Sequence, residues 1–231
     1  MTDVRDHYIS KVVEGRSFAD VGGLWGTINE KASIAHGFGA TDLGMFDLVT
    51  PSSDLWAKFA ERQATLGLPD VRCVSGDIIN LTAEPGHDRY DVVHCSGVLY
   101  HVPDQLRLLN ALRKLATQYV VLTSVVVPSK IENEEGVLDL PDAGVVFVPA
   151  LGGRERAIVR RHWEKVVGST HAIGITCDPE WDVKDYSPWW WMPTIPALQG
   201  MCAAAGFDVV ESSPSWNGNA LTLLLKVPAR D

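Results

Sequence analysis

The chain has 231 residues, of which 46% are hydrophobic and 21% charged, a composition typical of a globular protein that can bury a core. This length favours one α/β domain with an insertion over two full domains. The formal net charge of −9 argues against a main surface that grips a nucleic-acid backbone. The four scattered cysteines indicate neither a zinc site nor a disulfide framework. Without a signal peptide or a run long enough to span a bilayer, we expect a cytoplasmic protein that does not enter membranes.

The first half of the chain alternates short apolar runs with helical patterns. Strands are expected at 17–21, 43–47, 71–74, 90–95 and 119–127. After a leading helix over residues 3–14, a further helix is expected to begin at Thr27 or its neighbour. Two more are expected to begin at Pro51-Ser-Ser-Asp54, with serine caps, and at Asp104, which caps its helix. The fifth strand is a nearly continuous β-branched run, typical of a strand buried on both faces of a parallel sheet. Strands and helices that alternate through short loops predict a doubly wound sheet.

The alternation breaks between 128 and 191, a stretch that is acidic, then rich in Gly and Pro, then basic, then aromatic. It is too long for a plain connection, so we expect a functional cap. A helix over 195–205 and strands at 207–211 and 220–227 follow, and the polar link at Asn217-Gly218 predicts an antiparallel pair. The expected fold class is α/β, a seven-stranded, mostly parallel doubly wound sheet with a C-terminal antiparallel strand pair. The cap is inserted between strands five and six of this single domain, 1–231.

Four polar or glycine-rich features fall where the predicted parallel strands end. They are the glycine turn at 20–26, Asp47, the corner at 76–78 and the loop at 96–103. Open parallel sheets bind ligands at this edge, and an acid after the second strand can accept hydrogen bonds from a ribose diol. Glycines let a turn pass close under such a ligand. Each acid could instead cap a turn or helix, but their coincidence favours a nucleotide-like ligand.

These motifs resemble those of class I S-adenosylmethionine-dependent methyltransferases. Asp20-Val-Gly-Gly-Leu-Trp-Gly26 is similar to the acid-x-Gly-x-Gly-x-Gly turn of that family, and Gly76-Asp77-Ile78 is similar to its adenine corner. The stretch 90–104 resembles the strand-four loop of small-molecule and wobble-uridine methyltransferases, as does Trp189-Trp-Trp-Met-Pro-Thr194. The resemblance covers roughly residues 15–127 and 189–227. A dinucleotide-binding protein is a poorer match, because the Gly-x-Gly-x-x-Gly spacing is missing.

The resemblance implies S-adenosylmethionine as the cofactor. It also implies the residues that hold it, which are Asp20, Gly22, Gly23, Trp25, Gly26, Asp47, Leu48, Asp77, Ile78 and Ser96. The chain departs from the family at Leu24, which stands where the family has its middle glycine. We expect this side chain either to point away from the cofactor or to reshape the methionine end of the pocket.

A hydroxyl acceptor requires a base or a metal, since an alcohol is a poor nucleophile near neutral pH. His101 follows the fourth strand, where acceptor and cofactor should meet, and is therefore the first candidate for the base. It could instead pack to shape the loop. Tyr100 is a candidate for orienting the acceptor, and His171 and His162 in the insertion are further candidates. The remaining histidines are expected to be structural or exposed; they are His7, His36, His87 and His94.

The insertion 128–191 is expected to bind the acceptor. Its aromatic residues and nearby carboxylates suit a polyhydroxylated or ring-shaped molecule; they are Trp181, Tyr186, Trp189, Trp190, Trp191, Asp178, Glu180, Asp182 and Asp185. These carboxylates, or those between Glu132 and Asp142, could also hold Mg²⁺ against a sugar diol. No specific metal ligands are assigned.

The expected function is methylation of a hydroxyl on a small molecule, with a sugar or glycoside as the leading acceptor. One alternative is methylation of a tRNA wobble uridine. The net charge disfavours it, despite a basic cluster at Arg154, Arg156, Arg160, Arg161 and Lys165. A second alternative is a cofactor-binding module that has lost its chemistry, which Leu24 would fit. The oligomeric state is left open, with a homodimer among the options.

Overall fold

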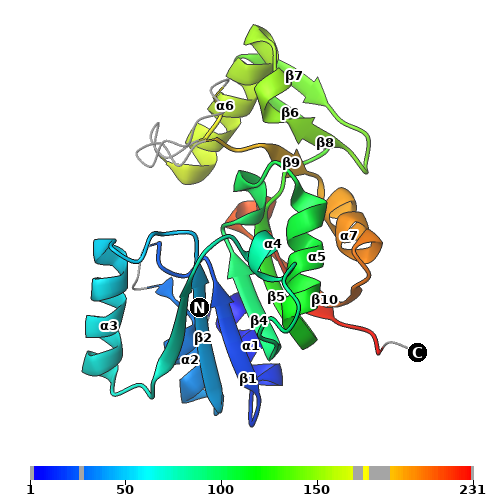
Figure 1. Cartoon of the computed structure of the whole chain (residues 1–231). Coiled ribbons are helices and arrows are strands. Elements are labelled where there is room, and N and C mark those ends of the chain that lie inside the picture. Colours follow the sequence, from blue (N-terminus) through cyan, green and yellow to red (C-terminus); the bar gives the residue numbers. More distant parts are fainter. Residues whose placement is uncertain (1–2, 26–28, 169–173, 177–187, 230–231) are drawn as a thin grey trace.

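The computed structural model describes residues 3–25, 29–168, 174–176 and 188–229. Its centre is a seven-stranded sheet with the strand order β10-β11-β5-β4-β1-β2-β3 (Figure 1). The strands are β1 (Ser17–Val21), β2 (Asp42–Asp47), β3 (Val71–Ser75), β4 (Tyr90–Ser96), β5 (Ala116–Val125), β10 (Asp208–Ser215) and β11 (Ala220–Lys226). β11 pairs antiparallel with both β10 and β5, and the other pairs of neighbouring strands are parallel. The predicted fold class is confirmed.

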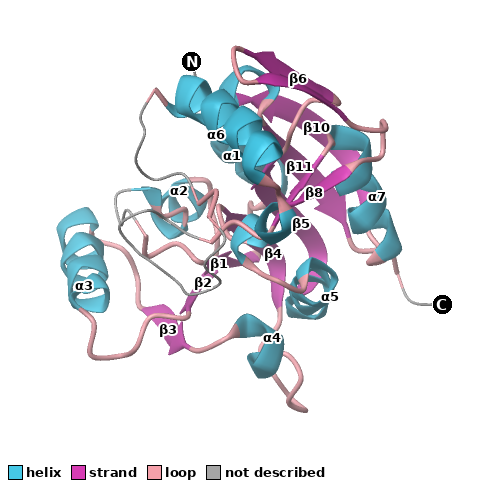
Figure 2. Cartoon of the chain, turned by 90° about the horizontal axis from the view of Figure 1, so that it is seen from above, coloured by secondary structure: helices cyan, strands magenta, loops and turns pink. Residues whose placement is uncertain are grey.

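Helices cover both faces of this sheet, as Figure 2 shows from above. One face packs against α1 (Val4–Val12) and α2 (Ala32–Gly37), with Phe59 of α3 (Asp54–Leu66) in the same core. The other face packs against α5 (Gln105–Leu115) and α7 (Ile195–Ala204), with the short α4 (Ile78–Leu81) nearby. Apolar side chains on both faces explain why the central strands are hydrophobic without alternation.

Helix starts follow the predicted capping residues in two cases. The side chain of Ser53 accepts the N–H of Leu55 at the start of α3, and Asp104 accepts the N–H of Arg107 at the start of α5. The predicted start at Thr27 or its neighbour lies outside the described residues, and the described helix α2 begins at Ala32. The carboxylate of Asp20 accepts the N–H of Lys31 at 2.7 Å. This bond ties Lys31, just before the helix, back to the end of β1.

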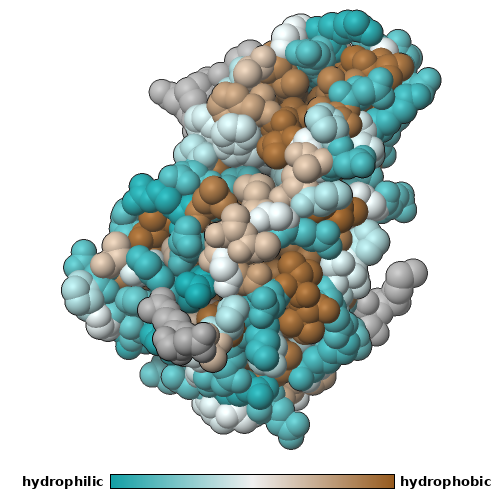
Figure 3. All heavy atoms as spheres, turned by 90° about the vertical axis from the view of Figure 1, so that its right-hand side faces the viewer, coloured by the Kyte–Doolittle hydropathy of each residue, from teal (hydrophilic) through white to brown (hydrophobic). Residues whose placement is uncertain are grey.

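The insertion forms a small unit with its own core. It contains two antiparallel strand pairs and one long helix: β6 (Lys130–Asn133) with β7 (Gly136–Asp139), β8 (Val145–Phe147) with β9 (Trp191–Pro193), and α6 (Gly153–Val167). Trp163, Trp189 and Met192 are buried together in its centre. Figure 1 shows this unit above the carboxyl ends of the parallel strands, and Figure 3 shows hydrophobic side chains on its outer surface. No helix in the described part of the chain is long and apolar enough to cross a membrane.

Candidate active site

A cavity of about 1290 Å³ lies at the carboxyl ends of β1 to β5. Most predicted site residues line it; they are Gly22, Trp25, Asp47, Leu48, Asp77, Ile78, Ser96, Tyr100 and His101. Asp20 and Gly23 are not among the lining residues, and Gly26 and His171 lie outside the described residues. The volume exceeds the roughly 300–1,000 Å³ of a typical small-molecule pocket, so the cavity has room for two ligands.

The turn after β1 requires glycine at position 22. Its φ of +78° lies in the left-handed region, and its N–H donates to the carbonyl of Phe46 at 2.8 Å. A Cβ atom at this position would overlap the side chain of Val98 across the turn. The backbone can therefore pass under a ligand only because no side chain is present.

Leu24, which departs from the family pattern, points away from the cavity. Its side chain is fully buried in the core beside α1 and α2, while its neighbour Trp25 lines the cavity and is 39% exposed. The N–H of Leu24 donates to Asp47 Oδ2 at 3.2 Å. Of the two outcomes expected for Leu24, the structure therefore shows the first. The residue anchors the turn to the core.

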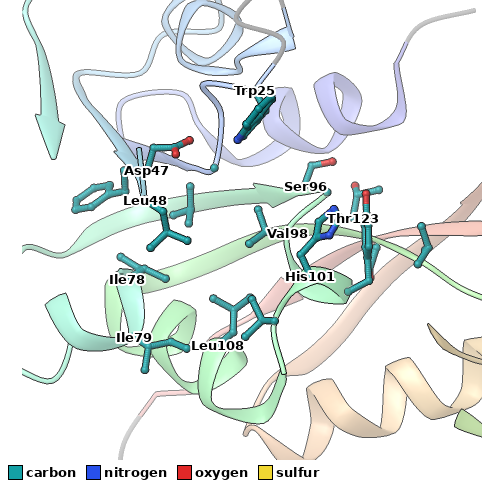
Figure 4. A pocket seen from close by; sticks show the side chains of 18 of the residues that line it. Trp25, Asp47, Leu48, Ile78, Ile79, Ser96, Val98, His101, Leu108 and Thr123 are labelled. Carbon is teal, nitrogen blue, oxygen red and sulfur yellow. The ribbon is translucent and has the colours of Figure 1, made fainter. Parts of the chain in front are cut away.

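Asp47 and Asp77 lie in the wall of the cavity at the ends of β2 and β3. Asp47 accepts the N–H groups of Leu24 and Val49, while burial raises the pKa of its carboxyl above the ordinary value. A carboxylate has about four acceptor positions, so Asp47 can still accept a ribose hydroxyl. Asp77 caps α4 by accepting the N–H of Ile79 at 2.9 Å. Asp47, Leu48 and Ile78 surround this end of the cavity in Figure 4.

Asp20 and Gly23 shape the turn behind the wall of the cavity. Asp20 is 1% exposed and holds both Lys31 N–H and His94 Nδ1 at 2.7 Å. A Cβ atom on Gly23 would overlap this carboxylate. His94, expected to be structural or exposed, is buried as the partner of Asp20. Direct cofactor contact by Asp20 and Gly23 remains a prediction.

His101 lies in a short 3-10 helix, η2 (Leu99–His101), directly after β4. Its Nδ1–H donates to the carbonyl of Pro188 at 3.1 Å, so the lone pair of the neutral ring is on Nε2. Burial lowers the pKa of His101 to about 4, which makes the imidazole neutral at pH 7. The ring of Tyr100 lies beside it, with ring centroids 4.2 Å apart.

Arg5 of the leading helix is a cavity residue that no sequence motif singled out. Its Nη1 lies 3.4 Å from Ser96 Oγ, and its Nη2 donates to Asp3 at 2.6 Å. Burial opposes its charge, but the carboxylate of Asp3 outweighs this effect and raises the pKa of Arg5. Arg107 is the other permanently charged cation among the described lining residues. Its side chain is 65% exposed, whereas that of Arg5 is 27% exposed. The polar leading helix was the only signal of this role in the sequence.

None of the described residues in 128–191 lines the cavity. Trp189 is 3% exposed and packs edge-on against Trp163, while Trp190 and Trp191 stack against Phe147. The other aromatic and acidic residues expected to contact the acceptor lie outside the described residues; they are Trp181, Tyr186, Asp178, Glu180, Asp182 and Asp185. His162, a weaker catalytic candidate, bonds Asn219 Oδ1 at 2.6 Å. Acceptor binding by the insertion remains a prediction.

The acidic part of the insertion is engaged in ion pairs. Glu132 pairs with Lys130, and Glu134 pairs with both Arg161 and Lys165. Within the part of the chain that the structure describes, no three His, Cys, Asp or Glu side chains are grouped closely enough to hold a metal ion. The Mg²⁺ proposal therefore gains no support from 132–142.

Comparisons with known proteins agree with this geometry. The model of a methyltransferase domain family matches residues 55–212. The magnesium protoporphyrin IX methyltransferase from Synechocystis PCC 6803, with bound SAH (S-adenosylhomocysteine), has a TM-score of 0.55 at 15% identity, over 97% of this chain and 82% of that chain. The N-terminal domain of EvdMO1, with SAH and D-fucose, has a TM-score of 0.56 at 17% identity, over 98% of this chain and 82% of that chain.

The glycopeptide N-methyltransferase MtfA, complexed with SAH, has a TM-score of 0.58 at 14% identity, over 97% of this chain and 86% of that chain. At these identities the likeness shows the fold. A comparison with curated proteins gives no match. Because the family model spans more than half of the chain, the chain belongs to the methyltransferase domain family, which confirms the predicted class I S-adenosylmethionine-dependent methyltransferase.

Proposed function

We propose that this protein methylates a hydroxyl group of a small molecule, with a sugar or glycoside as the leading acceptor. The observation that carries this proposal is the neutral imidazole of His101 in the wall of the cavity, directly after β4. A neutral imidazole can accept the hydroxyl proton that an O-methyltransferase must remove. The D-fucose in the EvdMO1 structure supports a sugar as the leading class.

The cavity residues fit S-adenosylmethionine, which supplies an electrophilic methyl group on a sulfonium centre. Asp47 can accept the ribose hydroxyls beside the glycine turn, and Ile78 can cover the adenine ring. Arg5 supplies the cation that the carboxylate of the methionine part requires, next to Ser96. The ring of Trp25 or Tyr100 can favour the sulfonium cation.

His101 would act as the base through Nε2, because its Nδ1–H is engaged with Pro188. A group whose pKa is about 4 is a weak base toward an alcohol. However, the hydroxyl becomes acidic as its oxygen bonds to the methyl carbon, so proton transfer late in that step requires only a weak base. Base catalysis of this kind typically contributes ~10²–10⁴-fold in rate. The hydroxyl of Tyr100 could orient the acceptor.

The two alternatives are less well supported. For tRNA methylation the basic cluster of α6 would have to contact phosphates, but Arg161 and Lys165 pair with Glu134, and Arg160 pairs with Glu164. For a module without chemistry, the suggestive feature was Leu24, which is packed in the core rather than in the cavity. An enzyme acting on a small molecule is therefore the better proposal.

The test is methyl transfer from isotopically labelled S-adenosylmethionine into fractionated cell extract, with Mg²⁺ and with a chelator. We expect label in the small-molecule or glycan fraction, and its loss under chelation would establish a metal requirement. Label in RNA would favour the wobble-uridine alternative. Cofactor binding without label in any fraction would favour the non-catalytic module. His101→Ala should lower turnover while leaving S-adenosylhomocysteine affinity nearly unchanged, and undiminished turnover would exclude the base role.

A further inference from the structure

A row of hydroxyl side chains crosses four neighbouring strands on the α1 face of the sheet. Ser96 of β4 is paired with Thr123 of β5, Thr123 with Thr222 of β11, and Thr222 with Ser213 of β10. Paired residues on neighbouring strands point to the same face of a sheet, so the four hydroxyls form one continuous polar row. Most of the other inward-facing positions of the sheet are apolar.

Contacts along the row confirm that its hydroxyls face one another and α1. Thr123 Oγ1 lies 2.9 Å from Thr222 Oγ1, and Ser213 Oγ lies 2.8 Å from the hydroxyl of Tyr8 in α1. Ser96, Thr123 and Thr222 line the cavity. Figure 4 shows Ser96 and Thr123 with His101 at the end of the cavity away from Ile78 and Ile79. The row therefore leads from the candidate base toward the edge of the sheet.

Ser124, also in the cavity wall, adds an unsatisfied hydroxyl. It is 1% exposed, and its Oγ has no hydrogen-bond partner among the described residues. A buried hydroxyl without a partner is costly and needs an explanation. Ser124 directly follows Thr123 in β5, so its side chain points to the opposite face of the sheet and is not part of the row.

Trp216 closes the outer end of this region. It is 57% exposed, lines the cavity and lies in the short turn η4 (Trp216–Gly218) between β10 and β11. Trp216 and Asn217 have φ values of +48° and +53°, and they are the only non-glycine residues with positive φ in the described part of the chain. A bulky side chain rarely adopts such a backbone conformation, and this kind of strain clusters at ligand sites.

The strained turn is held from two directions. Asn219 donates to the carbonyl of Trp216 through both its N–H, at 3.1 Å, and its Nδ2, at 2.9 Å. His162 of α6 donates from Nε2 to Asn219 Oδ1 at 2.6 Å. The insertion therefore supports the turn that carries Trp216, although its described residues do not line the cavity.

Beyond Ser96, whose Oγ lies 3.4 Å from Arg5 Nη1, the lining of this end carries no charge. Its described residues are Thr123, Ser124, Val125, Ser215, Trp216, Ala220 and Thr222. A phosphate or carboxylate would find no cation among these side chains. A neutral molecule with hydroxyl groups on its edge and an apolar ring face would find both hydrogen-bond partners and an aromatic surface.

We propose that this end of the cavity is the acceptor subsite for an uncharged, polyhydroxylated ring. The hydroxyls of Thr123 and Thr222 bind its edge, and Trp216 stacks on its face. His162 is a positioning residue that acts through Asn219. The proposal rests on the proposed function, since it supplies the acceptor class for the same reaction.

The test is saturation-transfer NMR on the full chain saturated with S-adenosylhomocysteine. The probes are methyl glycosides of glucose, galactose, mannose and fucose, and the charged control is methyl β-D-glucuronide. We expect at least one neutral glycoside to bind and the glucuronide not to bind. Trp216→Ala should weaken glycoside binding roughly tenfold, since it removes an aromatic face. Phe38→Ala, which removes an aromatic ring that is 44% exposed and does not line the cavity, should change nothing.

A second variant, Thr123→Val with Thr222→Val, removes both members of the bonded hydroxyl pair, so that neither is left unpaired. It should weaken glycoside binding while retaining S-adenosylhomocysteine affinity by calorimetry. Absence of binding by every neutral glycoside, preference for the glucuronide, or loss of S-adenosylhomocysteine affinity in Trp216→Ala would overturn the proposal. None of these readouts needs methyl transfer, whereas the labelling experiment tests transfer alone, so the two failures are distinguishable.

Discussion

Replacing His101 with glutamine should remove a specific pH dependence of stability. A histidine in an unfolded chain has a pKa of about 6.5, whereas burial lowers the pKa of His101 to about 4 in the folded protein. Between these two values the unfolded chain binds a proton that the folded protein does not bind. This group therefore reduces stability progressively as the pH falls from 6.5 to 4, and the loss is complete below 4. Above pH 6.5 it has no effect.

The size of the effect follows from the two pKa values. At pH 4.5 the linkage relation gives a loss of about 2.5 kcal/mol relative to pH 7.5. Glutamine cannot titrate, but its amide N–H can still donate to the carbonyl of Pro188, so the loop contact can be retained. The free energy of unfolding of wild type should consequently fall by about 2.5 kcal/mol more than that of His101→Gln over this range.

Urea unfolding at pH 7.5, 6.0 and 4.5 measures this difference. His36→Gln, at an exposed position outside the cavity, is the matched control for the loss of one histidine. The same reasoning predicts that the acid limb of the rate profile has its midpoint near pH 4 rather than 6.5. A constant stability difference between wild type and His101→Gln from pH 7.5 to 4.5 would refute the reasoning. So would an acid limb centred on 6.5.

Three further substitutions test the cofactor end of the cavity. Arg5→Met should weaken S-adenosylhomocysteine binding about 10–100-fold by calorimetry, since a charge-assisted hydrogen bond contributes about 1.5–3 kcal/mol. The control is Lys11→Met, which removes a cation from an exposed ion pair on the same helix. Equal affinities of Arg5→Met and wild type would contradict the assignment. Gly22→Ala should abolish measurable cofactor binding, because the added Cβ overlaps Val98 at a left-handed φ; retained affinity would show that the turn adapts. Leu24→Ala should lower the free energy of unfolding by about 2–5 kcal/mol while changing S-adenosylhomocysteine affinity little. The reverse pattern would mean that Leu24 contacts the cofactor.

Local patterns predicted the strands of the central sheet and most of the cofactor end of the cavity, but not the elements inside the insertion. The bounds of β1 and the caps Ser53 and Asp104 were predictable because strand alternation and capping depend on neighbouring residues. Asp47 and Asp77 were predictable because the carboxyl ends of parallel strands meet at one edge. The bond from the Lys31 N–H back to the Asp20 carboxylate was not predictable, because it joins residues that are 11 positions apart.

The acceptor end of the cavity could not be predicted in this way. Composition suggested that the aromatic run near Trp189 faces a ligand, but Trp189 lies in the core of the insertion, and composition alone cannot separate a small core from a ligand wall. The importance of Trp216 was not visible, because an exposed tryptophan in a turn has no local signature.

The sequence by itself determined the order of the sheet strands along the chain, the fold class and the family, because hydrophobic periodicity and the glycine turn are local properties of the chain. Only the tertiary structure decided that Leu24 faces the core and that Arg5 reaches Ser96. It also decided that Thr123 and Thr222, 99 positions apart, share one wall. The physical reason is that strand register and helix docking depend on packing between distant segments, which no single stretch of sequence encodes.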